Sequence, residues 1–91
     1  FYENIPRALP EGLCAKIKRS DVRVLPIFDV IAREGNVPER DMFNTYNMGV
    51  GMTITVDPAD VEKAIEILKA NGEDAYVLGE VVEGEKGVEL W

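Results

Sequence analysis

The segment GVGMTITV at residues 49–56 constrains the fold more than any other feature of the sequence. Apolar side chains alternate in it with glycine or threonine, at Val50, Met52, Ile54 and Val56. Successive side chains of a strand point to opposite faces, so this period of two predicts a strand with one buried face.

A helix is predicted directly after this strand, over residues 58–71. Asp57 is a good N-cap, Pro58 suits the first helical position, and Gly72 follows as a stop signal. The apolar stripe of this helix consists of Val61, Ala64, Ile65 and Leu68. A strand followed by a helix indicates a domain that contains both.

The rest of the chain fits the same class. We predict short helices over residues 1–9 and after Pro38, a helix from Pro26 to Gly35, and strands over residues 13–18, 75–82 and 88–91. The fold class is therefore α+β, with a mixed β-sheet and helices packed on one face. Residues 1–91 are expected to form a single partial domain.

Composition excludes several classes of protein. One cysteine, Cys14, and no histidine rule out a disulfide framework or a zinc cluster within one chain. The net charge of −7 argues against a nucleic-acid binder. No apolar run approaches the roughly 18 residues of a membrane span, and the N-terminal residues do not resemble a signal peptide. We therefore expect neither a nucleic acid nor a membrane as partner.

Catalysis within this chain is not expected. There is no histidine to act as a base, no phosphate-binding loop of the Walker type and no dinucleotide fingerprint. We predict no catalytic residue and no metal ligand. Cys14 is expected to be a small packing residue, since no histidine can activate its thiol.

The first candidate binding segment is at the N-terminus. Asn4 and Arg7 are three residues apart and share a face if the segment is helical. An amide beside a guanidinium can hold a phosphate through paired hydrogen bonds. Residues 1–23 also hold five basic and three acidic side chains, a local net charge of +2. The alternative is structural: Asn4 caps the turn, and Arg7 pairs with Glu3 or Glu11.

The second candidate segment is TYNMGVGM at residues 45–52. Gly49 and Gly51 leave one strand face without side chains, so a ligand or another backbone can approach closely. Asn47 can donate and accept hydrogen bonds at the mouth of the strand. The alternative is tight packing against a helix, with Asn47 ending the preceding helix.

Three blocks, FYENIPRALPEG, TYNMGVGMTITV and AIEILKANGEDAYVLGEVVEG, together resemble aminoimidazole ribonucleotide synthetase. The resemblance covers essentially the whole chain and implies the C-terminal portion of that ATP-dependent cyclo-ligase of purine biosynthesis. The family uses ATP and Mg²⁺ to close the imidazole ring of formylglycinamidine ribonucleotide. The formyl oxygen is activated as a phosphate, which the amidine nitrogen displaces.

The resemblance also implies the setting of this segment. In the family an N-terminal domain forms the homodimer and carries most nucleotide and metal contacts, and the enzyme is cytoplasmic. Asn4, Arg7, Asn47, Gly49 and Gly51 match family positions near the substrate cleft, so they are expected to contact the phosphorylated ribonucleotide. A glycine triplet that precedes the position of Phe1 in the family is not in this sequence. The 91 residues alone are expected to be inactive, to bind neither ATP nor Mg²⁺, and to associate with the upstream portion or with themselves.

Two other functions remain open on the sequence. One is a stand-alone α+β module that binds a small ligand on the Gly49–Gly51 face. The other is a fragment of another ATP-dependent synthetase or kinase of the same superfamily.

Overall fold

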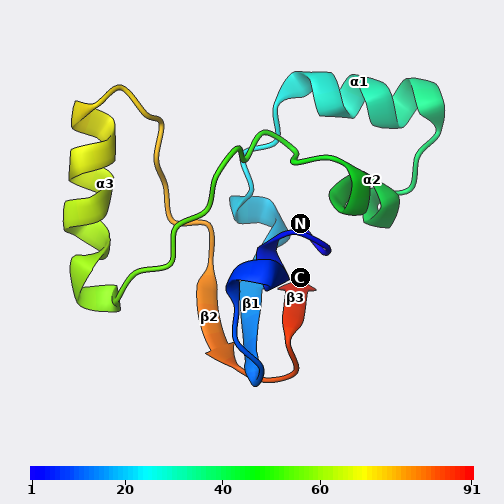
Figure 1. Cartoon of the computed structure of the whole chain (residues 1–91). Helices are drawn as coiled ribbons and strands as arrows, with labels where there is room; N and C mark the ends of the chain where they lie inside the picture. Colours follow the sequence, from blue (N-terminus) through cyan, green and yellow to red (C-terminus); the bar gives the residue numbers. More distant parts are fainter.

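The computed structural model describes residues 1–91 and confirms the α+β class (Figure 1). It contains three strands, three α-helices and three short 3-10 helices. In chain order the elements are η1 (Ile5–Ala8), β1 (Leu13–Ile17), η2 (Arg19–Asp21), α1 (Pro26–Gly35), α2 (Glu39–Thr45), η3 (Pro58–Asp60), α3 (Val61–Ala70), β2 (Glu80–Glu83) and β3 (Gly87–Leu90). No helix is both long and apolar enough to cross a membrane.

The sheet is mixed, as predicted. β1 lies in the centre, antiparallel to β2 and parallel to β3. Ala15 of β1 is paired with Val81 and Val88, whereas Lys16 is paired with Glu80 and Glu89. Paired residues lie on the same face of a sheet, so this register gives one apolar face and one charged face.

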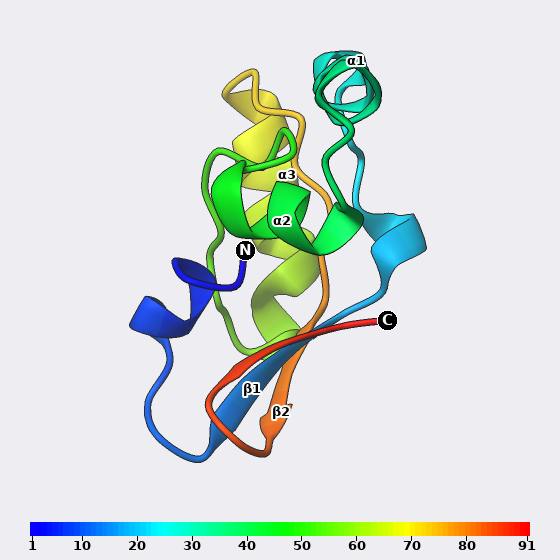
Figure 2. The same cartoon turned by 90° about the vertical axis from the view of Figure 1, so that its right-hand side faces the viewer.

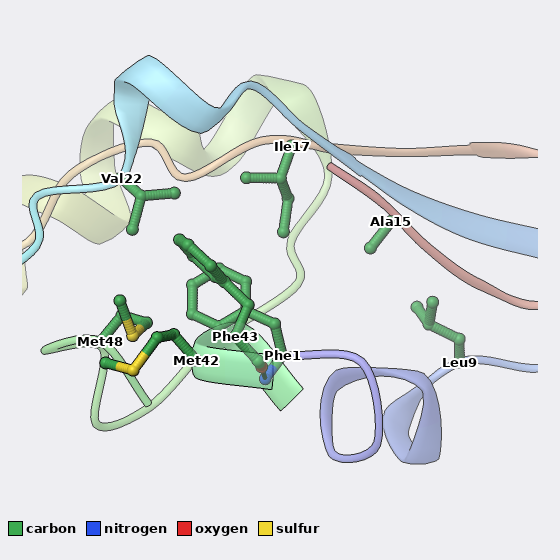
Figure 3. Close-up of a cluster of buried hydrophobic side chains, with 8 residues drawn as sticks. All are labelled: Phe1, Leu9, Ala15, Ile17, Val22, Met42, Phe43 and Met48. Atoms are coloured by element: carbon green, nitrogen blue, oxygen red, sulfur yellow. Dashed lines mark hydrogen bonds between the residues drawn. The ribbon is translucent and has the colours of Figure 1, made fainter. Parts of the chain in front are cut away.

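The core lies over the apolar face of the sheet (Figure 3). It consists of Phe1, Leu9, Ala15, Ile17, Val22, Met42, Phe43 and Met48. The rings of Phe1 and Phe43 meet edge to face at 5.0 Å, and the Phe1 amino group donates to the Phe43 carbonyl at 2.8 Å. These contacts hold α2 directly above the N-terminal segment (Figure 2). Met42 and Phe43 of α2 are the largest fully buried side chains of the chain.

The strand predicted over residues 49–56 is not formed. These residues have no regular secondary structure, and Met52 and Ile54 are 81% and 58% exposed. A segment becomes a β-strand only when its backbone forms hydrogen bonds with a neighbouring strand. The alternating pattern shows that the segment is suited to such pairing, but it does not supply the partner. Among residues 1–91 no segment pairs with this one. The strand predicted over residues 75–82 is likewise shorter, because pairing with β1 begins only at Glu80.

The helix predicted over residues 58–71 forms, but it lies away from the core. The Asp57 carboxylate accepts a hydrogen bond from the Ala59 N–H at 2.9 Å and caps η3, and α3 follows. No residue of α3 belongs to the core or packs against it, and Figure 1 shows this helix on the side of the molecule opposite α1 and α2. The segment after α3 is held to the body by Arg23, which pairs with Asp74 at 3.2 Å and stacks on Tyr76 at 4.2 Å.

Candidate functional site

A pocket of about 420 Å³ lies where the N-terminal turn meets the end of α2 and the extended segment after it. Its lining is rich in amides and hydroxyls and includes only two charged side chains, Glu3 and Arg7. The thirteen lining residues are Phe1, Glu3, Asn4, Ile5, Arg7, Asn44, Thr45, Tyr46, Asn47, Val50, Gly51, Met52 and Thr53. The two segments selected from the sequence therefore meet at one site.

Asn4 and Arg7 face this pocket from one turn of chain. Arg7 Nε donates to the Glu3 carbonyl at 3.1 Å, and its guanidinium makes no ion pair. The Asn4 side chain makes no capping hydrogen bond. Glu11, the alternative partner considered for Arg7, pairs instead with Lys86 at 3.7 Å. Part of the structural alternative is therefore present: Asn4 occupies the N-cap position of η1 without a side-chain capping bond, and Arg7 bonds to the backbone of Glu3 rather than to its carboxylate. The Asn4 amide and the terminal nitrogens of the Arg7 guanidinium make no hydrogen bond within the chain.

The three residues of the second segment have different positions. The Asn47 side-chain oxygen accepts from the Gly49 N–H at 2.9 Å and closes a turn, while Asn47 also lines the pocket. Gly49 has φ +103° and does not line the pocket; a Cβ there would lie 2.8 Å from Leu25 Cγ. Gly51 lines the pocket and has open space where a Cβ would be. Asn4, Arg7, Asn47 and Gly51 are therefore brought together, whereas the turn accounts for Gly49.

Two lining residues lie outside both segments selected from the sequence and were therefore not predicted. These are Asn44, from the last turn of α2, and Thr53, from the extended segment. The available signal was the concentration of asparagine at positions 44 and 47, next to the glycines. With Asn4 they give the pocket three amide side chains.

The electrostatics of the pocket are nearly balanced. Arg7 supplies a positive charge and Glu3 a negative one, so an anion must be bound mainly by Arg7 and the amide donors. No group of three or more histidine, cysteine, aspartate or glutamate side chains could hold a metal ion. Cys14 is buried and free, as expected of a packing residue.

The whole chain, residues 1–91, matches the family model described as AIR synthase related protein, C-terminal domain. It is also similar to proteins named phosphoribosylformylglycinamidine cyclo-ligase. The one from Agathobacter rectalis is 54% identical over 90 residues, which cover 99% of this chain and 26% of the relative. Those from Lachnospira eligens and a Thermoanaerobacter species are 52% and 50% identical, with 26% and 27% of their lengths covered.

This chain thus spans about a quarter of the length of the curated relatives it matches. The family match extends over every residue, and the identities stand well above what unrelated chains show. The resemblance seen in the three sequence blocks is confirmed. The chain belongs to the AIR synthase related family: it matches the C-terminal domain of that family and about a quarter of the length of relatives named phosphoribosylformylglycinamidine cyclo-ligase.

Proposed function

We propose that this chain forms one wall of the substrate site of a phosphoribosylformylglycinamidine cyclo-ligase. The relatives carry the name of that enzyme, and this chain covers only their C-terminal quarter. The pocket between the N-terminal turn and the end of α2 is then the part of the site that these residues supply.

The observation that supports this proposal most directly is the placement of Asn4 and Arg7. Both line a pocket of about 420 Å³; the Asn4 side chain makes no capping bond, and Arg7 uses only its Nε, in a bond to the Glu3 carbonyl at 3.1 Å. A guanidinium with free N–H groups binds a phosphate in a two-pronged geometry, and a neighbouring amide adds a further donor. We assign to this pair the phosphate of the ribonucleotide substrate. Asn47 and Gly51, across the pocket, would face the rest of the substrate.

The chemical step belongs mainly to the remainder of the enzyme in this proposal. ATP would transfer a phosphoryl group to the formyl oxygen. The amidine nitrogen would then attack the formyl carbon and displace phosphate from it. Residues 1–91 contain no cluster suited to Mg²⁺, so we assign ATP and the metal to the other part of the polypeptide. The role of this chain is to bind and orient the substrate. We propose a cytoplasmic, homodimeric whole enzyme, in line with the family resemblance.

Arg7→Ala in the whole enzyme tests the assignment. A hydrogen bond to a charged group contributes about 1.5–3 kcal/mol, so we expect KM for the ribonucleotide to rise by roughly 10- to 150-fold. Arg7→Lys should recover part of this loss, since the charge remains but the planar fork does not. The measurement is steady-state kinetics with the ribonucleotide varied at saturating ATP.

Arg33→Ala is the matched control. Arg33 is also an exposed arginine, but it lies on α1, pairs with Glu34 at 3.3 Å and does not line the pocket. Its removal should leave KM unchanged. Unchanged kinetics for Arg7→Ala would exclude Arg7 from the site and contradict the proposal.

The two other functions considered are less well supported. A stand-alone binding module would have to keep the apolar side chains of Met52 and Ile54 in water. Another synthetase or kinase of the superfamily is disfavoured because the relatives described above are named as cyclo-ligases.

A further inference from the structure

The extended segment at residues 51–56 has backbone groups that this chain does not use. Between Gly51 and Val56 no backbone N–H or C=O makes a hydrogen bond to any other part of residues 1–91. The last such bond before the segment is from the Val50 N–H to the Asn47 carbonyl at 2.9 Å, and the next is from Asp60 to Asp57 at 2.8 Å. A row of unpaired N–H and C=O groups on an extended chain is a template for pairing with another strand.

The side chains of this segment suit a buried strand rather than a surface loop. Met52, Ile54 and Val56 are 81%, 58% and 37% exposed, and they alternate with glycine and threonine. No charged residue occurs from Thr45 to Val56. Strands on a free edge are usually protected by charged side chains, proline or a bulge. None of these is present here, so the segment is built to be covered.

We propose that residues 51–56 form a docking strand that pairs with a strand of the cyclo-ligase polypeptide outside residues 1–91. The relatives are about four times longer than this chain, which covers 26–27% of their lengths. Most of such an enzyme therefore lies outside these residues and is available to cover the docking strand. This inference rests on membership of the family and is independent of the substrate assignment.

A second copy of this chain is the less suitable occupant. Each copy carries a net charge of −7, and acidic Asp57, Asp60 and Glu62 directly follow the docking strand. Two copies would therefore approach against their mutual repulsion.

Docking also affects the candidate site. Gly51, Met52 and Thr53 belong both to the docking strand and to the lining of the pocket. A strand that pairs with these residues runs along the rim of the pocket. The pocket wall would then be complete only after docking, which couples substrate binding to assembly.

The first test is association, measured without any activity assay. Residues 1–91 are co-expressed with the complementary part of the Agathobacter rectalis relative, and the mixture is analysed by light scattering after gel filtration. We expect a one-to-one complex. Hydrogen exchange should show the amides of residues 52–56 unprotected in the chain alone and slowed by about 100-fold or more in the complex.

Proline substitutions make the test specific to the backbone. The N–H groups of Thr53 and Thr55 point to one edge of an extended chain, and that of Ile54 points to the other. Thr53→Pro and Ile54→Pro therefore each remove a donor from a different edge. Neither N–H is used within residues 1–91, so the unfolding midpoint of the chain alone should not change. We expect at least one variant to raise the dissociation constant of the complex by about tenfold or more. This is the effect of losing one hydrogen bond between the paired strands and adding the steric clash of the proline ring.

Each result has a definite meaning. Loss of binding with one variant identifies the paired edge, and loss with both identifies a strand with neighbours on both sides. Full-strength binding by both variants, with unprotected amides at residues 52–56 in the complex, would overturn the proposal. So would a dimer of residues 1–91 that protects these amides and that the complementary part does not displace.

Discussion

At the residue scale, Gly49 and Gly51 are alike in sequence and different in the structure. Gly49 has φ +103° and lies against Leu25, whereas Gly51 has open space around it and lines the pocket. A side chain at Gly49 is therefore strained twice, by the backbone conformation and by the contact. A methyl group at Gly51 meets nothing within this chain.

A pair of alanine substitutions separates these roles. We expect Gly49→Ala to lower the free energy of unfolding by about 1–3 kcal/mol, because φ is positive and Leu25 must move. Gly51→Ala should change it by less than about 0.5 kcal/mol, as for an unobstructed surface position. Urea denaturation of residues 1–91 measures both. An equal loss of unfolding free energy in the two variants would show that the positive φ at Gly49 and its contact with Leu25 do not require glycine at this position.

Sequence reasoning predicts the site residues that are close together in the sequence and misses those that depend on long-range packing. The spacing of Asn4 and Arg7 predicts their common face because both lie in one local turn. Asn44 was missed because its place depends on the packing of Phe43 against Phe1, 42 residues away in sequence. Local spacing carries no information about such a contact.

At the element scale, the correctly predicted elements are those with local signals. Helix α1 begins at Pro26 and ends before Asn36, which has a left-handed conformation at φ 51°, and both signals are readable from the sequence. The segment at residues 49–56 has an equally clear pattern, but a strand also needs a partner. The alternating pattern predicts which face of the strand would be buried, but it does not predict which other segment covers that face.

Helix α3 gives a prediction at this scale, because it contributes nothing to the core. The 3-10 turn that leads into it, η3, is capped by the bond from the Ala59 N–H to the Asp57 carboxylate. Asp57→Ala should weaken the cap by about 1 kcal/mol and speed amide exchange in α3 by roughly fivefold. Exchange in β1 should not change.

The control for this prediction is Asp60→Ala. Asp60 also precedes α3, but its side chain makes no capping hydrogen bond, so its effect should be smaller. Hydrogen exchange followed by mass spectrometry resolves the two regions. A matching acceleration in β1 would show that α3 unfolds together with the sheet, contrary to the separation seen in the structure.

At the scale of the whole molecule, the chain leaves much of its apolar surface uncovered. Only nine of its 91 residues are buried, while large apolar side chains of α1, α3 and the docking strand remain exposed. Exposed apolar area of this extent marks an interaction surface. Because the pocket shares residues with the docking strand, catalysis should require the rest of the enzyme.

Reconstitution tests this requirement. Residues 1–91 alone, and the complementary part of the Agathobacter rectalis relative alone, should show no ring closure, and the mixture should recover ATP-dependent activity. Ile54→Pro, at a residue that does not line the pocket, should lower recovered activity in proportion to the complex lost. Arg7→Ala should form the complex normally and lose activity through KM, since Arg7 lies outside the docking strand. Turnover by residues 1–91 alone would contradict the assignment of the chemical step to the rest of the enzyme. Activity of the mixture without complex formation would show that the pocket does not need the docked strand.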